Sequence, residues 1–229
     1  MKTRLSLLLL FAFYLSSAQT QLSVAYVTGK FDQTHHPDFT AVTTPYTNLP
    51  AQFLRKDVYK AFKKMYDAAA KEKISLNIIS STRNFDYQKG IWERKWIKFA
   101  DTVAATVRAK KILEYSAMPG ISRHHWGTDV DLINLTNEYF DSTEGKRAYV
   151  WLQKNAATYG FCQPYTAGRA QGYNEERWHW SYMRVSKLLT AWAGKNLNTT
   201  FITGFSGSET ATSLNVVRDY VLGINKDCL

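Results

Sequence analysis

Cysteine, proline and histidine are all scarce in this 229-residue sequence, which contains two, five and five of them. Two cysteines exclude a scaffold held together by several disulfides, and their wide separation argues against a structural zinc site built from thiolates. The sequence has no internal repeat and no low-complexity tract. Beyond the N-terminal residues, no apolar run approaches the roughly 20 residues that a membrane-spanning helix needs. The sequence therefore predicts neither a repeat protein nor a disordered or membrane-embedded chain.

The first 18 residues have the three regions of an export signal in the expected order. Lys2 and Arg4 supply positive charge, residues 5–15 are almost wholly apolar, and residues 16–18 form a small-residue cleavage site. The mature chain is predicted to begin at Gln19. We expect an exported protein, periplasmic or secreted, with no membrane anchor after removal of the signal.

Positive charge dominates the rest of the chain. The formal net charge is +10, and the predicted signal contributes only two of these charges. Such an excess favours anionic partners. For an exported protein these are acidic polymers of the cell envelope and not nucleic acid.

The periodicity of the apolar residues predicts a single α+β domain. Helices are predicted over 55–72, 83–110 with a break near Gly90, 146–159, 185–193 and 209–222. Strands are predicted over 24–27, 76–80, 129–133, 161–164 and 177–183. Gly160 and Gly194 are expected to end two of the helices.

We expect residues 19–229 to form this domain in three parts. They are an N-terminal arm over 19–54, a core over 55–194 and a C-terminal extension over 195–229. Cys162 and Cys228 would tie the extension to the core if they formed a disulfide, and the sequence leaves this open.

Histidines and carboxylates are concentrated in two short segments, 122–131 and 176–179. In the first, a glycine between His124 and Asp131 permits a sharp bend into the predicted strand. If the strand that holds His179 is its neighbour, three metal ligands meet. Two imidazoles and one carboxylate leave a fourth position open for water, which is the layout of a catalytic zinc site.

A carboxylate near such a site can act as a base. Glu176 precedes His179 by three residues and can take a proton from zinc-bound water, whose pKa falls to about 7. Glu175 is the competing candidate for this role. Asp129 competes with Asp131 as the ligand, because residues two apart on a strand share a face.

The two segments resemble the paired signature of the LAS metallopeptidases, a group named after lysostaphin, D-Ala-D-Ala peptidases and sonic hedgehog. The spacing is similar to that of the D-alanyl-D-alanine carboxypeptidase branch, the vancomycin-resistance type. The matching positions are Ser122, His124, Gly127 and Asp131 in the first segment, and Glu176, Trp178 and His179 in the second. Asp129 stands where the family has alanine. The resemblance implies a LAS/hedgehog-like fold with a small antiparallel sheet flanked by helices, and Zn²⁺ as the cofactor.

The segment 80–88 resembles the part of these peptidases that places an arginine at the end of a strand. By this resemblance Arg83 would bind the terminal carboxylate of the substrate, for which a guanidinium offers a two-pronged, always-charged partner. Gln88 and Ser122 would be its hydrogen-bonding neighbours. His125 is expected to lie behind the ligands or at the surface.

The resemblance implies a monomeric zinc carboxypeptidase that removes terminal D-alanine from peptidoglycan stem peptides, its natural partners. His124, Asp131 and His179 would bind the metal, and Glu176 would be the general base. Three alternatives stay open: an endopeptidase that cuts peptide cross-links, an L,D-carboxypeptidase, and a non-catalytic zinc-containing protein that binds the cell wall.

Overall fold

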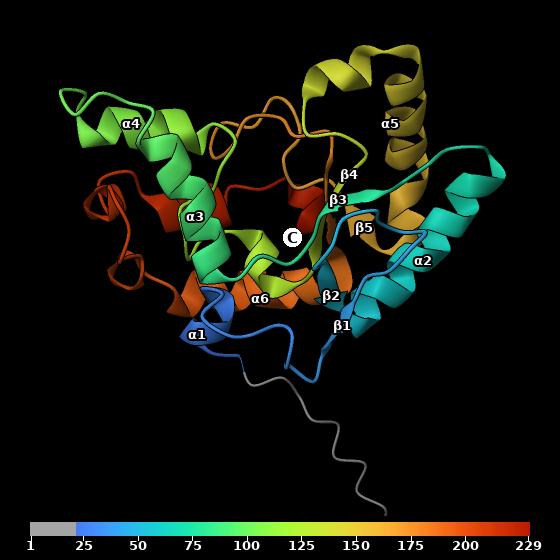
Figure 1. The fold of residues 1–229 in the computed structure, drawn as a ribbon, viewed down its shortest axis with the longest axis horizontal. Helices are drawn as coiled ribbons and strands as arrows, with labels where there is room; N and C mark the ends of the chain where they lie inside the picture. Colours follow the sequence, from blue (N-terminus) through green and yellow to red (C-terminus); the bar gives the residue numbers. More distant parts are fainter. Residues whose placement is uncertain (1–21) are drawn as a thin grey trace, which may run out of the picture.

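Four short strands form an antiparallel sheet at the centre of the computed structural model, which describes residues 22–229. Their order is β3, β4, β6, β5, with bounds Ile78–Ser80, Asp129–Leu132, His179–Tyr182 and Phe161–Cys162. Together with the helices around them they confirm the predicted α+β domain with a small antiparallel sheet (Figure 1). The predicted export signal lies outside the described residues.

Helices lie on both sides of these strands (Figure 1). On one side are α2 (Lys56–Lys71) and α5 (Thr143–Asn155), and on the other are α3 (Phe85–Trp96) and α4 (Ala105–Leu113). The fifth long helix, α6 (Met183–Asn196), follows β6 without a loop. Within residues 22–229, none of the helices combines the length and the hydropathy needed to span a lipid bilayer.

The N-terminal arm contains a short helix and a two-stranded ribbon. The ribbon pairs β1 (Phe39–Ala41) with β2 (Phe53–Arg55) in antiparallel fashion. The strand predicted over 24–27 is wrong, because this segment is the helix α1 (Val24–Val27). Ser23 caps it, since its hydroxyl oxygen accepts a hydrogen bond from the Tyr26 amide at 3.1 Å.

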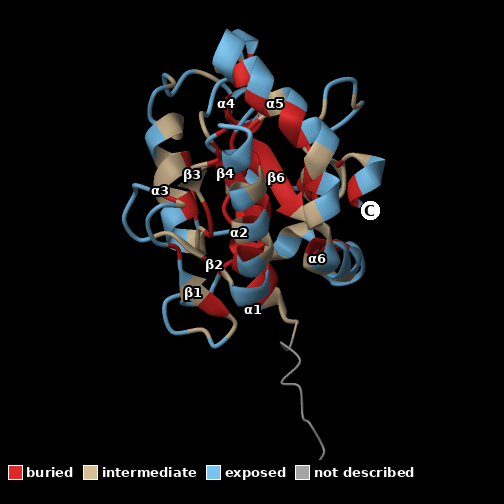
Figure 2. Ribbon diagram, turned by 90° about the vertical axis from the view of Figure 1, so that its right-hand side faces the viewer, coloured by how far each residue is buried: buried red, intermediate tan, exposed pale blue. Residues whose placement is uncertain are grey.

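The two faces of the central sheet differ in chemistry because side chains alternate along a strand. The apolar face packs against α2 and α5 through Val130, Leu132, Phe161 and Trp180. The opposite face carries Asp129, Asp131, His179 and Ser181, all of them buried. Figure 2 shows β6 as a buried strand in the interior, whereas the outer surfaces of the helices are exposed. The sheet therefore holds a polar cluster inside the molecule.

One long predicted helix is two separate helices in the structure. The helix predicted over 83–110 is divided by residues 97–104, and Gly90 lies inside α3. The dividing loop is held by the buried Arg108, whose guanidinium donates hydrogen bonds to the Ala100 carbonyl and, at 3.0 Å, to Asp101.

Toward the C-terminus, α6 continues through Gly194, where a side chain would have ordinary contacts only. The long helix predicted over 209–222 is wrong. Asn215 has a φ of 48°, which breaks the helical path and leaves a five-residue π-helix over Val217–Val221.

A disulfide joins Cys162 of β5 to Cys228, with their Cα atoms 5.7 Å apart. The sequence left open whether these two cysteines are paired, and the structure shows that they are. Beside it, the Asn225 amide donates a hydrogen bond to the Pro164 carbonyl at 2.8 Å. The C-terminal extension is therefore fastened to the segment that follows β5.

Removing this disulfide should destabilise the whole domain, because it closes a loop with a sequence separation of 66 residues. For a loop of this length we expect the double variant Cys162→Ala, Cys228→Ala to lose about 4 kcal/mol of unfolding free energy. Urea denaturation of the oxidised protein and the variant measures the difference. A change below about 0.5 kcal/mol would contradict a structural role for this bond.

Candidate active site

Pairing of β4 with β6 brings the two histidine-rich segments together, since Asp131 lies directly opposite His179 in the register. His124 arrives from a 3₁₀ turn over Arg123–Trp126, immediately before β4. The turn ends at Gly127, which has a φ of 71°. A Cβ at Gly127 would lie 2.3 Å from the ring of Phe39, so both backbone conformation and space require glycine.

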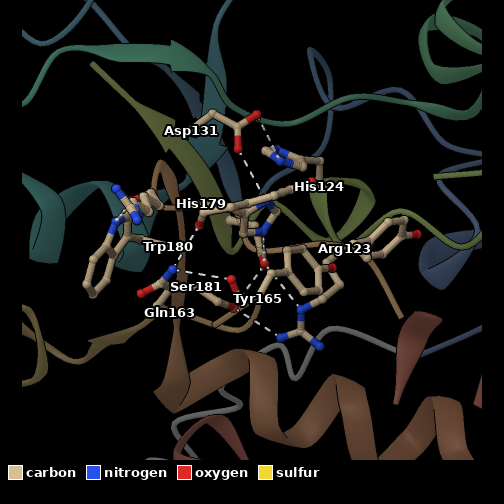
Figure 3. Close-up of polar contacts among 12 residues, drawn as sticks. Arg123, His124, Asp131, Gln163, Tyr165, His179, Trp180 and Ser181 are labelled. Carbon is tan, nitrogen blue, oxygen red and sulfur yellow. Dashed lines mark hydrogen bonds and ion pairs between the residues drawn. The ribbon is translucent and has the colours of Figure 1, made fainter. Parts of the chain in front are cut away.

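His124, Asp131 and His179 each present one ligand atom to a common point, and these atoms lie within 4.8 Å of one another. Figure 3 shows the three side chains pointing toward one another, with interactions from Asp131 to both histidines. Each of the three residues is at most 4% exposed. The cluster thus lies inside the molecule and not on its surface.

Hydrogen bonds fix which nitrogen of each histidine faces the cluster. His124 Nδ1 donates to the Ser81 carbonyl at 2.7 Å, which leaves Nε2 directed at Asp131, 3.2 Å away. His179 Nε2 lies 2.9 Å from Asp129 Oδ1, which leaves Nδ1 directed at Asp131 at 3.2 Å. Both rings therefore direct their second nitrogen at the same point, where a neutral imidazole can act as a metal ligand.

A metal ion fits this point. His124 Nε2 and Asp131 Oδ1 are buried and have no hydrogen-bond partner. A buried polar atom without a partner costs about 1–3 kcal/mol, and a cation held between the two atoms would remove that cost. Two imidazole nitrogens and one carboxylate oxygen suit Zn²⁺ and leave a coordination position open.

Asp129 and Asp131 have different positions relative to the cluster. Asp131 faces the cluster, whereas Asp129 lies behind His179 and accepts hydrogen bonds from Arg123 Nε at 3.2 Å and Ser181 Oγ at 3.0 Å. Burial acts to raise the pKa of Asp129, but Arg123 and the hydrogen bond from His179 outweigh it and hold this pKa well below its usual range. Asp129 thus stays ionised and orients the His179 ring.

Glu176 is the carboxylate that reaches the cluster. Its Oε2 lies 3.3 Å from His179 Nδ1, and burial raises its pKa, against the opposing effect of His179. Glu175 points elsewhere, toward Arg177 at 3.3 Å and the Tyr149 hydroxyl at 3.5 Å. Of the two glutamates that the sequence offered, only Glu176 lies beside the cluster.

A cavity of about 240 Å³ opens onto this cluster and contains the side chain of Arg83. The backbone of Arg83 is held on both sides, because its amide donates to the His124 carbonyl and its carbonyl accepts from His125 Nδ1 at 2.6 Å. Its guanidinium lies 3.9 Å from Asp131, and its Nε is buried without a partner. Arg83 therefore presents a weakly paired cation next to the cluster of His124, Asp131 and His179.

The other predicted site residues also line the cavity. Gln88 donates through Nε2 to the Ala117 carbonyl at 2.8 Å, and its Oε1 has no partner. Ser122 is buried in the wall. His125 is fully buried, accepts a hydrogen bond from the Gly120 amide at 3.0 Å, and stays neutral because burial lowers its pKa to about 3. It is a structural bridge between segments and not a surface residue.

A family model described as VanY, D-alanyl-D-alanine carboxypeptidase, matches residues 51–185, which is more than half of the chain. The chain belongs to this family. The resemblance expected from the two motifs is therefore confirmed.

The chain is also similar to a carboxypeptidase compared by sequence and to a solved structure. The putative carboxypeptidase YodJ of Bacillus subtilis (strain 168) is 34% identical over 151 residues, which cover 62% of this chain and 51% of YodJ. The chain thus spans about half the length of that relative. The solved LdcB LD-carboxypeptidase is 27% identical with a TM-score of 0.52, over 64% of this chain and 68% of its own.

A mutant of the vancomycin-resistance D,D-pentapeptidase VanY, solved with Zn(II), shares the fold of this VanY-family domain. Its TM-score is 0.51 at 20% identity, over 73% of this chain and 92% of that one. Together with LdcB it confirms the expected LAS-like fold.

Some residues of the cavity wall in this VanY-family domain had no signal in the sequence. Tyr165 packs on the ring of His179 with centroids 4.7 Å apart, and Tyr173 packs on Tyr165 at 4.9 Å. Lys95 and Ser116 form another part of the wall. These residues come from segments far from the two motifs, and only the folded chain brings them to the cavity.

The different positions of Asp129 and Asp131 predict different effects on metal affinity. Asp131→Asn should abolish zinc binding, because Asp131 belongs to the cluster that would hold the ion, whereas Asp129→Asn should weaken it by about 10–100-fold. A zinc competition titration measures both, and circular dichroism checks that each variant is folded. Equal losses in the two variants, or a larger loss in Asp129→Asn, would contradict the assignment of Asp131 as the ligand.

Proposed function

We propose that this VanY-family protein is a zinc carboxypeptidase that removes the terminal D-alanine from peptidoglycan stem peptides. The main support for this proposal is the position of Arg83, whose guanidinium lies 3.9 Å from the Asp131 carboxylate in the same cavity. In a C-terminal residue the carboxylate is attached to the Cα that bears the scissile nitrogen. An arginine that binds this carboxylate must therefore lie within a few ångströms of the reacting centre, as Arg83 does.

In the proposed mechanism His124 Nε2, Asp131 and His179 Nδ1 would hold the zinc ion. A zinc ion held there would lower the pKa of a water molecule and polarise the scissile carbonyl. Arg83 holds the substrate carboxylate with charge-assisted hydrogen bonds, and Gln88 Oε1 offers an acceptor nearby. Asp129 keeps the proton on His179 Nε2, so that Nδ1 remains a ligand.

Glu176 is the proposed general base. It accepts a proton from the attacking water and then passes it to the leaving amine of D-alanine. The raised pKa of Glu176, caused first by burial, suits both steps because it brings the carboxyl closer to neutral pH.

A second candidate differs only in the stereochemistry of the bond that is cleaved. The likeness to LdcB, named as an LD-carboxypeptidase, supports removal of D-alanine from an L-residue. The metal ligands, the base and the carboxylate partner would be the same. Peptides that end in D-Ala-D-Ala or in L-Lys-D-Ala distinguish the two reactions.

Peptidoglycan lies outside the cytoplasm, and this agrees with the export signal expected in the sequence. We therefore propose that the protein acts in the periplasm or after secretion, on stem peptides as its partners. Its net positive charge favours association with anionic wall polymers.

Release of D-alanine from a pentapeptide tests the proposed reaction directly. We expect release by the zinc-loaded protein, loss of release with a chelator, and recovery when zinc is added back. Glu176→Gln should keep stoichiometric zinc and lower kcat by about 10²–10⁴-fold, since it removes only the base. Near-normal turnover in Glu176→Gln would exclude this base, and bound zinc without any hydrolysis by the wild type would favour a binding protein.

Arg83 distinguishes a carboxypeptidase from an endopeptidase. Arg83→Ala should lower kcat/KM by at least about 100-fold on peptides with a free C-terminal carboxylate. It should have a much smaller effect on a cross-linked dimer in which the scissile bond is internal. Arg177→Ala is the matched control, because Arg177 pairs with Asp141 and Glu175 away from the cavity. Equal losses on both substrates would weaken the carboxypeptidase proposal.

A further inference from the structure

Lys95 is a second cation in the wall of the cavity. It lies on α3 with Gln88 and Ile91, and the spacing of these residues places all three on the helix face toward the cavity. Lys95 Nζ donates a hydrogen bond to Ser116 Oγ, across the cavity wall. The sequence did not predict that Lys95 lines the cavity, because a lysine on a helix is usually exposed.

No carboxylate of the described residues forms a salt bridge with this lysine. Among residues 22–229, no Asp or Glu oxygen lies within 4.0 Å of Lys95 Nζ, and Ser116 Oγ is a neutral partner. An ammonium has three donors, so two remain for a ligand. Burial lowers the pKa of Lys95, Arg83 lowers it further and Glu176 raises it, so both groups lie within its electrostatic reach.

The charges that line the cavity leave room for a second anion. Arg83 and Lys95 balance Asp131 and Glu176, and the zinc ion of the proposed function adds two positive charges. A substrate that brings only its terminal carboxylate would leave one positive charge uncompensated. Arg123 does not alter this balance, because it is paired with the fully buried Asp129.

We propose that Lys95, with Ser116, forms a subsite for a second carboxylate of the substrate, on the acyl side of the scissile bond. This inference rests on the proposed function. Departing D-alanine has only a methyl side chain, so the second carboxylate belongs to the residues that precede it. The favoured substrates are peptides in which a diamino diacid, such as meso-diaminopimelate, stands where other peptides have lysine.

The test compares two synthetic peptides that differ only in this carboxylate: one carries meso-diaminopimelate and the other L-lysine before the D-alanine terminus. Wild type should favour the diacid peptide. In Lys95→Met the ratio of the two kcat/KM values should fall by about ten-fold or more, mainly through KM, as expected for a hydrogen bond to a charged group. Lys95→Arg should keep the preference.

Lys98→Met is the matched control, because Lys98 is exposed just beyond α3 and does not line the cavity. It should keep the wild-type ratio. An equal loss on both peptides in Lys95→Met would mean that Lys95 binds the terminal carboxylate, and this would overturn the proposal. An unchanged ratio would overturn it too. Thermal melting shows whether Lys95→Met is folded, and recovery of the preference in Lys95→Arg guards against a general packing effect.

Failure of the proposed function would look different. If the wild type cleaves neither peptide, the peptidase proposal fails. Calorimetric binding of the same two peptides to zinc-loaded wild type and Lys95→Met still tests the subsite. Tighter binding of the diacid peptide that is lost in Lys95→Met would support it, and equal binding of both peptides by the wild type would overturn it.

Discussion

The pairing of β4 with β6 is the interaction on which the rest of the site depends. Its register sets Asp131 opposite His179 and Asp129 opposite Ser181. A shift by one residue would turn these side chains into the hydrophobic cluster under α2 and α5, and would bring Val130 and Trp180 into the site. The apolar face of the sheet thus fixes the register, and the register brings together two members of the cluster that lie 48 residues apart in the sequence.

Burial of the polar face of the central sheet is unfavourable, and the charged side chains behind the cluster, Arg123 and Asp129, compensate each other there. Arg123 and Asp129 are both fully buried, and Arg123 also donates hydrogen bonds to Thr190 at 2.8 Å and to Ser181 at 3.1 Å. A buried ion pair is tolerated only when its remaining donors and acceptors are satisfied in this way. Asp129, which stands in place of the family's alanine, therefore orients His179 and is itself neutralised by Arg123.

The C-terminal extension supports the wall of the cavity from behind, although it lies outside the matched family region. A row of aromatic rings runs from His179 through Tyr165 and Tyr173 to Tyr220, with successive centroids 4.7, 4.9 and 5.0 Å apart. The disulfide to Cys228 fastens the same region to β5. The cavity wall beside His179 is thus supported by residues close to the end of the chain, and both parts belong to one packed unit.

The sequence by itself determined the α+β class, most of the core elements and the residues that form the cluster, because motif spacing and apolar periodicity are local properties. It did not determine the helix at 24–27, the division between α3 and α4, or the irregular path after Asn215, where tertiary contacts outweigh local preference. Only the tertiary structure decided that Asp131 and not Asp129 faces the cluster, that Glu176 and not Glu175 reaches it, and that Lys95 joins the cavity. The physical reason is the same in each case: neighbouring residues share a sequence pattern, and the packing of distant segments decides where each side chain points.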